Sequence, residues 1–213
     1  VVMGTEEIGD TMVLWMLRSA CAALLLASPT AALLISAGRS TARRARASTI
    51  MASFDAPVVM GTEEMMADKG KGHGTSPVPI QKDLRWNCDA ATADKICNYN
   101  RHYAEYGGYW ERATSFLQEE SEKSGEITFF DSNTGKPLFY GPKGRDWGAF
   151  VRESKAHGWP SFRDTEVNWD YVRVLPNGEC ISVDGTHLGH NLPDGSGNRY
   201  CINLVSVAGK PLK

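Results

Sequence analysis

Short apolar runs separated by turn residues fill the C-terminal part of the chain. From Glu126 onward the runs are ITFF, PLFY, YVRVL, CISV and CINLVSVA, and turns such as PNGE (176–179) and PDGSGN (193–198) separate them. Apolar runs of this length bounded by Gly, Pro and Asn predict short strands. The stretch RDWGAFVRESK (145–155) is the exception and favours a helix. We therefore expect a mainly β domain over residues 126–213.

The pattern before this domain is helical and aromatic. Asp89 precedes AATADKIC in the position of an N-cap, and WERATSFLQEESEK predicts a second helix. We expect a partly helical extension over residues 83–125. Its aromatic residues are predicted to pack the extension onto the β domain, with a ligand cage as the alternative; they are Tyr103, Tyr106, Tyr109 and Trp110. Residues 58–82 are rich in Gly and Pro and predict a flexible linker.

The first 57 residues have the composition of a targeting presequence. Residues 12–34 are mostly apolar, with small residues near their end, as in a signal peptide. Residues 35–53 then carry four arginines and no acidic residue, as in a transit peptide. This order resembles the bipartite presequences of algae with secondary plastids, and it predicts a plastid location. An ordinary signal peptide for the secretory pathway and a retained membrane anchor are the alternatives.

Charge and cysteine usage exclude some classes of function. The formal net charge is −2, which gives no strong field toward nucleic acid or anionic lipid. No two cysteines form a C-x-x-C pair, so a zinc site with four thiolates has no obvious scaffold. Outside the presequence, the thiols could form two disulfides, stay free or act as a redox relay; they are Cys88, Cys97, Cys180 and Cys201.

Three motifs lie close together near the C-terminus. They are HGWPSF (157–162), THLGHNLPDG (186–195) and NRYCIN (198–203). Together, and in this order, they resemble the methionine-R-sulfoxide reductase family over roughly residues 126–210. The resemblance implies a compact β fold of two sheets, the β-tent, with the active site on one of them. It also implies an oxidoreductase that reduces methionine sulfoxide, since this family repairs one of the two sulfoxide epimers.

The resemblance assigns the reacting groups. Cys201 would be the nucleophile that attacks the sulfoxide sulfur. A thiol needs a nearby cation or dipole to become a thiolate near neutral pH, and His190 or Arg199 could supply it. His190 or His187 would protonate the sulfoxide oxygen, because histidine titrates near neutrality. Asn203, two residues from Cys201, would hold the site by hydrogen bonds.

The resemblance also assigns the substrate pocket. Trp159 would form the surface against which the substrate methyl group packs, with support from Phe162. Asp194 and Arg199 would form an ion pair that shapes the site.

Each of these residues also has an alternative interpretation that involves no catalysis. Cys201 could be a buried structural thiol, since free cysteines are among the most buried residues. His187 and His190 could bind a metal, or one of them could be structural. Trp159 could be a core residue, and Asp194 with Arg199 a plain surface pair.

The chain departs from the family at the zinc ligands. Many members carry two C-x-x-C pairs that bind a structural zinc. Here Asp131 and Thr134 occupy the first pair of positions, and only Cys180, with Val183 as its partner, remains in the second. We therefore predict no metal and no cofactor, and a need for an external thiol reductant.

The second departure concerns the resolving cysteine. His157 stands where many members have it, immediately before GWPSF. A sulfenic acid on Cys201 needs another thiol to become a disulfide. Cys88, Cys97 and Cys180 are the internal candidates, unless Cys88 and Cys97 are bonded to each other. Glutathione, glutaredoxin or thioredoxin are the external candidates.

The sequence thus predicts thiol-dependent reduction of methionine-R-sulfoxide, either protein-bound or free. One alternative is a non-catalytic accessory subunit of a plastid membrane complex that reuses the fold. Another is a redox sensor in which Cys201 is oxidised without turnover.

Overall fold

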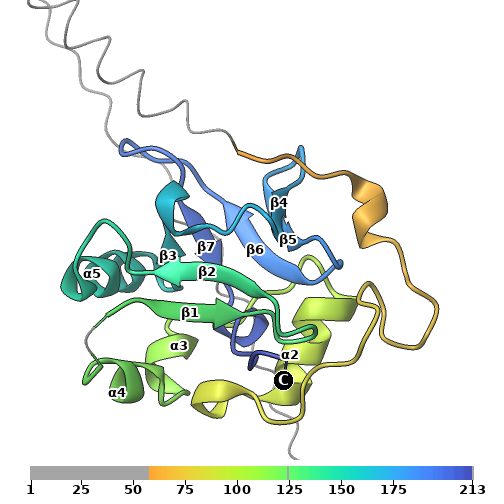
Figure 1. Ribbon diagram of the computed structural model, residues 1–213, viewed down its shortest axis with the longest axis horizontal. Helices are drawn as coiled ribbons and strands as arrows, with labels where there is room; N and C mark the ends of the chain where they lie inside the picture. The colour runs from red at the N-terminus through yellow and green to blue at the C-terminus, as the bar shows by residue number, and fades with distance from the viewer. Residues whose placement is uncertain (1–57, 124, 213) are drawn as a thin grey trace, which may run out of the picture. The chain divides into compact units, whose positions relative to one another are not determined.

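Two antiparallel sheets form the C-terminal part of the computed structural model, which describes residues 58–123 and 125–212 (Figure 1). The smaller sheet pairs β1 (Ile127–Phe130) with β2 (Pro137–Gly141). The larger sheet has the order β3-β7-β6-β5-β4. Its strands are β3 (Ser161–Phe162), β4 (Val172–Val174), β5 (Glu179–Ser182), β6 (His187–Asn191) and β7 (Tyr200–Ile202). The expectation of a mainly β domain with two sheets is confirmed at this level.

The register of the larger sheet sorts the side chains into two faces. Cys201 on β7 lies opposite Ser161 on β3 and His190 on β6, and His190 lies opposite Glu179 on β5. Directly paired residues of antiparallel strands point to the same face, so this row shares one face of the sheet. The neighbouring row, Cys180–Gly189–Ile202, belongs to the other face, which covers the core.

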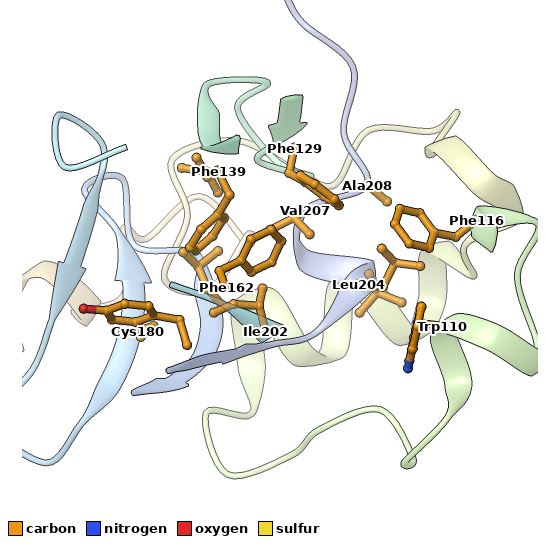
Figure 2. Close-up of a cluster of buried hydrophobic side chains, with 14 of the residues drawn as sticks. Trp110, Phe116, Phe129, Phe139, Phe162, Cys180, Ile202, Leu204, Val207 and Ala208 are labelled. Atoms are coloured by element: carbon orange, nitrogen blue, oxygen red, sulfur yellow. The ribbon is translucent and has the colours of Figure 1, made fainter. Parts of the chain in front are cut away.

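An aromatic core fills the space between the two sheets and helix α5 (Trp147–His157) (Figure 2). The Phe162 ring stacks on Phe139 with centroids 4.5 Å apart, and it meets Phe129 edge-on at 4.9 Å. Phe150 of α5 packs on the same ring at 5.4 Å. Helix α5 confirms the helix predicted over 145–155, and Asp146 caps it by accepting from the Ala149 N–H at 2.7 Å.

The extension is helical, as predicted, but in shorter pieces. Helix α2 (Ala90–Asp94) has the predicted Asp89 cap, which accepts from the Thr92 N–H at 2.7 Å. A π-helical turn continues it over Lys95–Tyr99. The second predicted helix is split into α3 (Tyr109–Arg112) and α4 (Phe116–Glu120). Thr114 lies between them and bonds the Trp110 carbonyl with its hydroxyl at 2.6 Å, which competes with the helical pattern.

The aromatic residues of the extension divide into two groups. Trp110 is fully buried beside Phe116, and the Phe116 ring lies 5.9 Å from that of Phe129 in β1, so this part of the extension packs onto the β domain as predicted. Tyr109 is also buried. Tyr103 and Tyr106 are 45% and 57% exposed, so the prediction was wrong for these two side chains.

Residues 58–82 make fixed contacts, which differs from the flexible linker expected from their composition. The Gly61 N–H donates to the Val174 carbonyl at 2.9 Å, and the Val174 N–H donates to the Val59 carbonyl at 3.0 Å. Further along, Met66 is buried in a small cluster with Leu175, which follows β4, and Ile181 of β5. An edge strand such as β4 leaves backbone N–H and carbonyl groups unpaired on its outer side. Residues 59–61 satisfy those of Val174.

The predicted presequence, residues 1–57, lies outside the described residues. Within 58–123 and 125–212, no helix is both long and apolar enough to span a membrane.

Candidate active site

A pocket of about 270 Å³ opens on the face of the larger sheet that carries Cys201. Five residues proposed from the sequence line it together: Trp159, His187, His190, Cys201 and Asn203. His187 and His190 come from β6, Cys201 and Asn203 from β7 and the residue after it, and Trp159 from the segment between α5 and β3. The extension supplies another part of the lining, from Arg101 to Ala104.

Cys201 is half-buried in β7, directly across from His190. Gly189 lets the two strands approach closely, since a β-carbon there would lie 2.0 Å from the Cys201 carbonyl oxygen. Burial raises the pKa of the Cys201 thiol, and the guanidinium of Arg199 beside it opposes that rise. The cation expected to favour the thiolate is therefore present, but desolvation outweighs it in the free protein.

His187 is fixed by a buried carboxylate. Its Nδ1 lies 2.8 Å from Oε1 of Glu179, and both side chains are almost fully buried. Burial alone would raise the pKa of Glu179, but hydrogen bonds from His187 and Arg101 lower it to about 2. An ionised carboxylate can only accept, so His187 carries its proton on Nδ1. This leaves Nε2 as the ring nitrogen that can serve the pocket.

His190 sits at the mouth of the same pocket. Its ring centroid is 5.8 Å from that of His187. Burial lowers the pKa of His190, and the nearby rings of His187 and His102 lower it further. His190 is therefore neutral at neutral pH and can accept a proton.

Asn203 and Trp159 are both held by backbone contacts. The Asn203 Nδ2 group donates to the Leu188 carbonyl at 3.0 Å, and its Oδ1 accepts from the Glu105 N–H at 3.1 Å. The Trp159 Nε1–H donates to the Glu105 carbonyl at 3.0 Å, while its ring packs against Gly107. Trp159 is half-buried and presents its ring to the pocket, rather than lying in the core.

The acidic residues Glu105 and Glu179 were not found by sequence reasoning. Glu105 is buried and accepts from the N–H groups of Leu204 and Val205 at 2.9 and 3.2 Å. Burial raises its pKa to about 8 against these hydrogen bonds. The available signal was a charged residue inside an otherwise aromatic stretch, and an acidic residue that opens an apolar strand.

Asp194 and Arg199 lie next to the pocket but do not line it. The predicted contact is present, with Arg199 Nε 3.3 Å from Asp194 Oδ2. The Asp194 carboxylate also accepts hydrogen bonds from Nη1 and Nη2 of Arg163, at 3.1 and 2.9 Å. The sequence did not suggest this partner. The contact of Arg199 Nε with Asp194 is an ion pair without hydrogen-bond geometry, and within the described residues Nη1 of buried Arg199 has no hydrogen-bond partner either. The pair therefore supports Cys201 from the side and does not face the substrate space.

Phe162 does not support the pocket. Its neighbour Ser161 pairs with Cys201, so alternation along β3 turns Phe162 to the opposite face. There it is fully buried among the aromatic rings of the core. The assignment of Phe162 to the substrate site was wrong for this reason.

The other described cysteines are buried, free thiols: Cys88, Cys97 and Cys180. Cys180 lies on the core face, and β6 separates its strand from that of Cys201. Two strand spacings amount to about 10 Å, beyond the ~7 Å between α-carbons that a disulfide tolerates. Cys97 contacts the Ser206 hydroxyl at 3.4 Å, and burial raises the pKa of all three thiols.

Hydrogen bonds occupy the place where the resemblance puts a zinc ion. Buried Asp131 accepts from the Asn133 N–H at 2.8 Å and from the Thr186 hydroxyl at 3.0 Å. This links the end of β1 to the β5–β6 turn. Cys180, the one remaining family ligand, packs in the core instead. The absence of zinc stays a prediction.

One other group of side chains in the described part of the chain has the spacing of metal ligands. It consists of Glu153, His157 and Asp194. The guanidinium of Arg163 bonds both Glu153 and Asp194, so a cation already satisfies this group. His157, at the position of the family's resolving cysteine, is exposed at the end of α5.

Comparisons with known proteins find sequence similarity to enzymes whose chemistry the residues of the pocket could carry out. Curated proteins of Escherichia coli K12 (strain DH10B), O157:H7 (strain EC4115) and strain SE11 are each 35% identical to this chain over 82 residues. All carry the name peptide methionine sulfoxide reductase MsrB. Over these 82 residues the chain is similar to MsrB proteins. The match covers 33% of this chain and 53% of each relative, so the chain spans about half the length of the curated relatives it matches. No model of a known protein family matches the chain.

Proposed function

We propose that this protein is a thiol-dependent methionine-R-sulfoxide reductase that uses Cys201 as its nucleophile. The observation that carries the proposal is the shared pocket of Cys201, carboxylate-bound His187 and the Trp159 ring. A soft nucleophile, a proton source and an apolar surface are the groups that reduction of a sulfoxide requires. The similarity to MsrB proteins supports the same assignment.

The reaction balances with one cysteine. Cys201 Sγ attacks the sulfoxide sulfur while the oxygen is protonated, and the thiol proton is lost. The oxygen then passes to Sγ, which leaves a methionine thioether and a sulfenic acid on Cys201. Methionine sulfur is reduced by two electrons, and Cys201 is oxidised by two. Two equivalents of an external thiol return Cys201 to the thiol and release a disulfide and water.

The described geometry gives each group a role in this scheme. His190 is neutral and adjacent to Cys201, so it takes the thiol proton. His187 gives a proton from Nε2 to the sulfoxide oxygen, which requires the imidazolium form, protonated on both nitrogens, that the Glu179 carboxylate stabilises through Nδ1. Asn203 orients the same space, and Trp159 packs against the methyl group. Arg199 stabilises the thiolate as it forms.

The burial of the other thiols favours regeneration by an external reductant. Cys180 faces the core, and Cys88 and Cys97 are enclosed in it or against it. We therefore propose that glutathione, glutaredoxin or thioredoxin attacks the sulfenic acid directly. The proposal includes action in a plastid, no metal or other cofactor, and protein-bound or free methionine sulfoxide as substrate.

Separate assays of the two sulfoxide epimers test this function. The wild-type protein is incubated with dabsylated methionine-R-sulfoxide or methionine-S-sulfoxide and dithiothreitol. Cys201→Ser is the test variant and Cys97→Ser the control. Reduction of the R epimer alone, absent in Cys201→Ser and present in Cys97→Ser, supports the proposal. No reduction of either epimer by folded wild-type protein refutes it and favours the accessory-subunit alternative.

A further inference from the structure

Arg101 of the extension reaches the His187 ring through one shared carboxylate. Its Nη2 lies 2.6 Å from Glu179 Oε2, and its Nε lies 3.1 Å from both oxygens. Glu179 in turn accepts from His187 at 2.8 Å. Exposed Glu63 also pairs with Arg101, on its outer side. His187 is therefore linked, through Glu179, to a residue of the extension that precedes Glu179 by 78 positions.

Glu105 joins the same loop to the rest of the pocket. Its backbone N–H and carbonyl bond Asn203 Oδ1 and Trp159 Nε1, at 3.1 and 3.0 Å. Its carboxyl group accepts from the two N–H groups that follow Asn203, on Leu204 and Val205. These donors are buried, so the loss of their acceptor would leave them unsatisfied.

We infer that the loop Arg101–Glu105 is a positioning element of the Cys201 pocket, in which Arg101 orients His187 through Glu179 and Glu105 orients Asn203 and Trp159. Neither residue needs to touch the reacting atoms for this role. The three side chains they hold, His187, Asn203 and Trp159, all line the pocket together with Cys201. The extension is thereby part of the active centre and not an appendage to it. The kinetic part of this inference rests on the proposed function, whereas its structural part does not.

A matched pair of buried glutamates gives the test. Glu120, also in the extension, accepts from the Trp86 Nε1–H at 2.7 Å, away from the pocket. Exchange rates of the Trp86 and Trp159 indole N–H groups are measured by NMR in the wild type, Glu105→Leu and Glu120→Leu. Glu105→Leu should accelerate exchange at Trp159 at least about tenfold and leave Trp86 unchanged. Glu120→Leu should do the reverse.

Kinetics of the same variants then separate positioning from stability. Glu105→Leu and Arg101→Gln should each lower kcat for the R epimer at least about tenfold, with a smaller change in KM. Glu105→Gln and Arg101→Lys should recover part of the loss, because each keeps one of the original hydrogen bonds. Arg112→Gln, which removes an exposed charge of the extension 3.8 Å from Glu111, should match the wild type.

The possible outcomes are distinct. Wild-type exchange at Trp159 together with kcat within about twofold, in folded Glu105→Leu and Arg101→Gln, overturns the inference. If Glu105→Leu does not fold, Glu105→Gln is judged by the same criteria. If the wild type reduces neither epimer, the proposed function fails. The exchange rates, with iodoacetamide alkylation of Cys201, then decide the positioning role alone, and unchanged values for both overturn it.

Discussion

Cys180 and Cys201 lie on opposite faces of one sheet, with strand β6 between their strands. The Cys180 side chain is enclosed in the core, whereas Cys201 reaches the pocket. This relationship separates the nucleophile from the nearest thiol in the sheet. It determines what can happen to Cys201 after it is oxidised.

Oxidised Cys201 should accumulate as a sulfenic acid when no reductant is present. One equivalent of methionine-R-sulfoxide is added to the reduced protein, followed by dimedone, and the products are mapped by mass spectrometry. We expect the adduct on Cys201 and no internal disulfide, since the other described thiols are buried. Cys180→Ala should give the same adduct yield. A disulfide between Cys201 and Cys88, Cys97 or Cys180 would contradict the external-thiol step.

Glu179→Gln should lower stability and flatten its dependence on acid pH. The pKa of Glu179 is about 2 in the folded protein against an ordinary 4.5. A lowered pKa stabilises the fold above the unfolded value, and this contribution disappears as pH falls from 4.5 toward 2. At neutral pH we expect a loss of about 2 kcal/mol in the free energy of unfolding. Urea denaturation between about pH 6 and pH 3 measures both effects. If the free energies of unfolding of the wild type and the variant differ by the same amount at every pH in this range, Glu179 is not the group responsible.

Trp159→Ala should weaken catalysis more than it weakens folding. Loss of the ring removes the apolar surface of the pocket, and we expect kcat/KM for the R epimer to fall about tenfold to hundredfold. Trp159→Phe keeps an aromatic surface but cannot donate to the Glu105 carbonyl, so its loss should be intermediate. Steady-state kinetics on both variants provide the measurement. Equal kcat/KM for Trp159→Ala and the wild type would remove Trp159 from the substrate site.

Phe162 variants should behave in the opposite way. Phe162→Ala is expected to cost about 3–5 kcal/mol of unfolding free energy, because it opens a cavity among packed rings. The milder Phe162→Leu should retain wild-type kcat and KM while its urea midpoint drops. A large rise in KM for folded Phe162→Leu would return Phe162 to the substrate site.

Arg199→Gln should raise the pKa of the Cys201 thiol and so lower the fraction of thiolate. Burial already raises the pKa of Cys201, and Arg199 is the cation that opposes it. Removing a positive charge disfavours the thiolate, so the pKa should rise further and alkylation by iodoacetamide should need a higher pH. The rate of alkylation is followed against pH in both proteins. A profile displaced to lower pH would mean that Arg199 does not act on the thiol.

The sequence predicted those parts of the molecule whose signals are local. The Asp89 cap, helix α5 and most of the strands follow from residue type and spacing. Five of the residues that meet at the pocket, Trp159, His187, His190, Cys201 and Asn203, followed from motifs close together in the chain.

Other features depend on long-range contacts that no local pattern records. Phe162 could be assigned to its face only with the β3–β7 register in hand. Arg101 and Glu105 act through partners that lie 78 and 98 positions away, Glu179 and Asn203. Residues 58–82 were expected to be flexible from their composition, but backbone pairing of residues 59–61 with a sheet edge fixes the start of this segment.

The pairing of residues 59–61 with strand β4 also bears on self-association. An uncovered edge strand offers a row of free N–H and carbonyl groups to any other extended chain. Here the protein's own backbone occupies part of that row at Val174. A version of the chain shortened past Gly61 would expose the template, and its failure would be aggregation at the sheet edge rather than loss of the pocket.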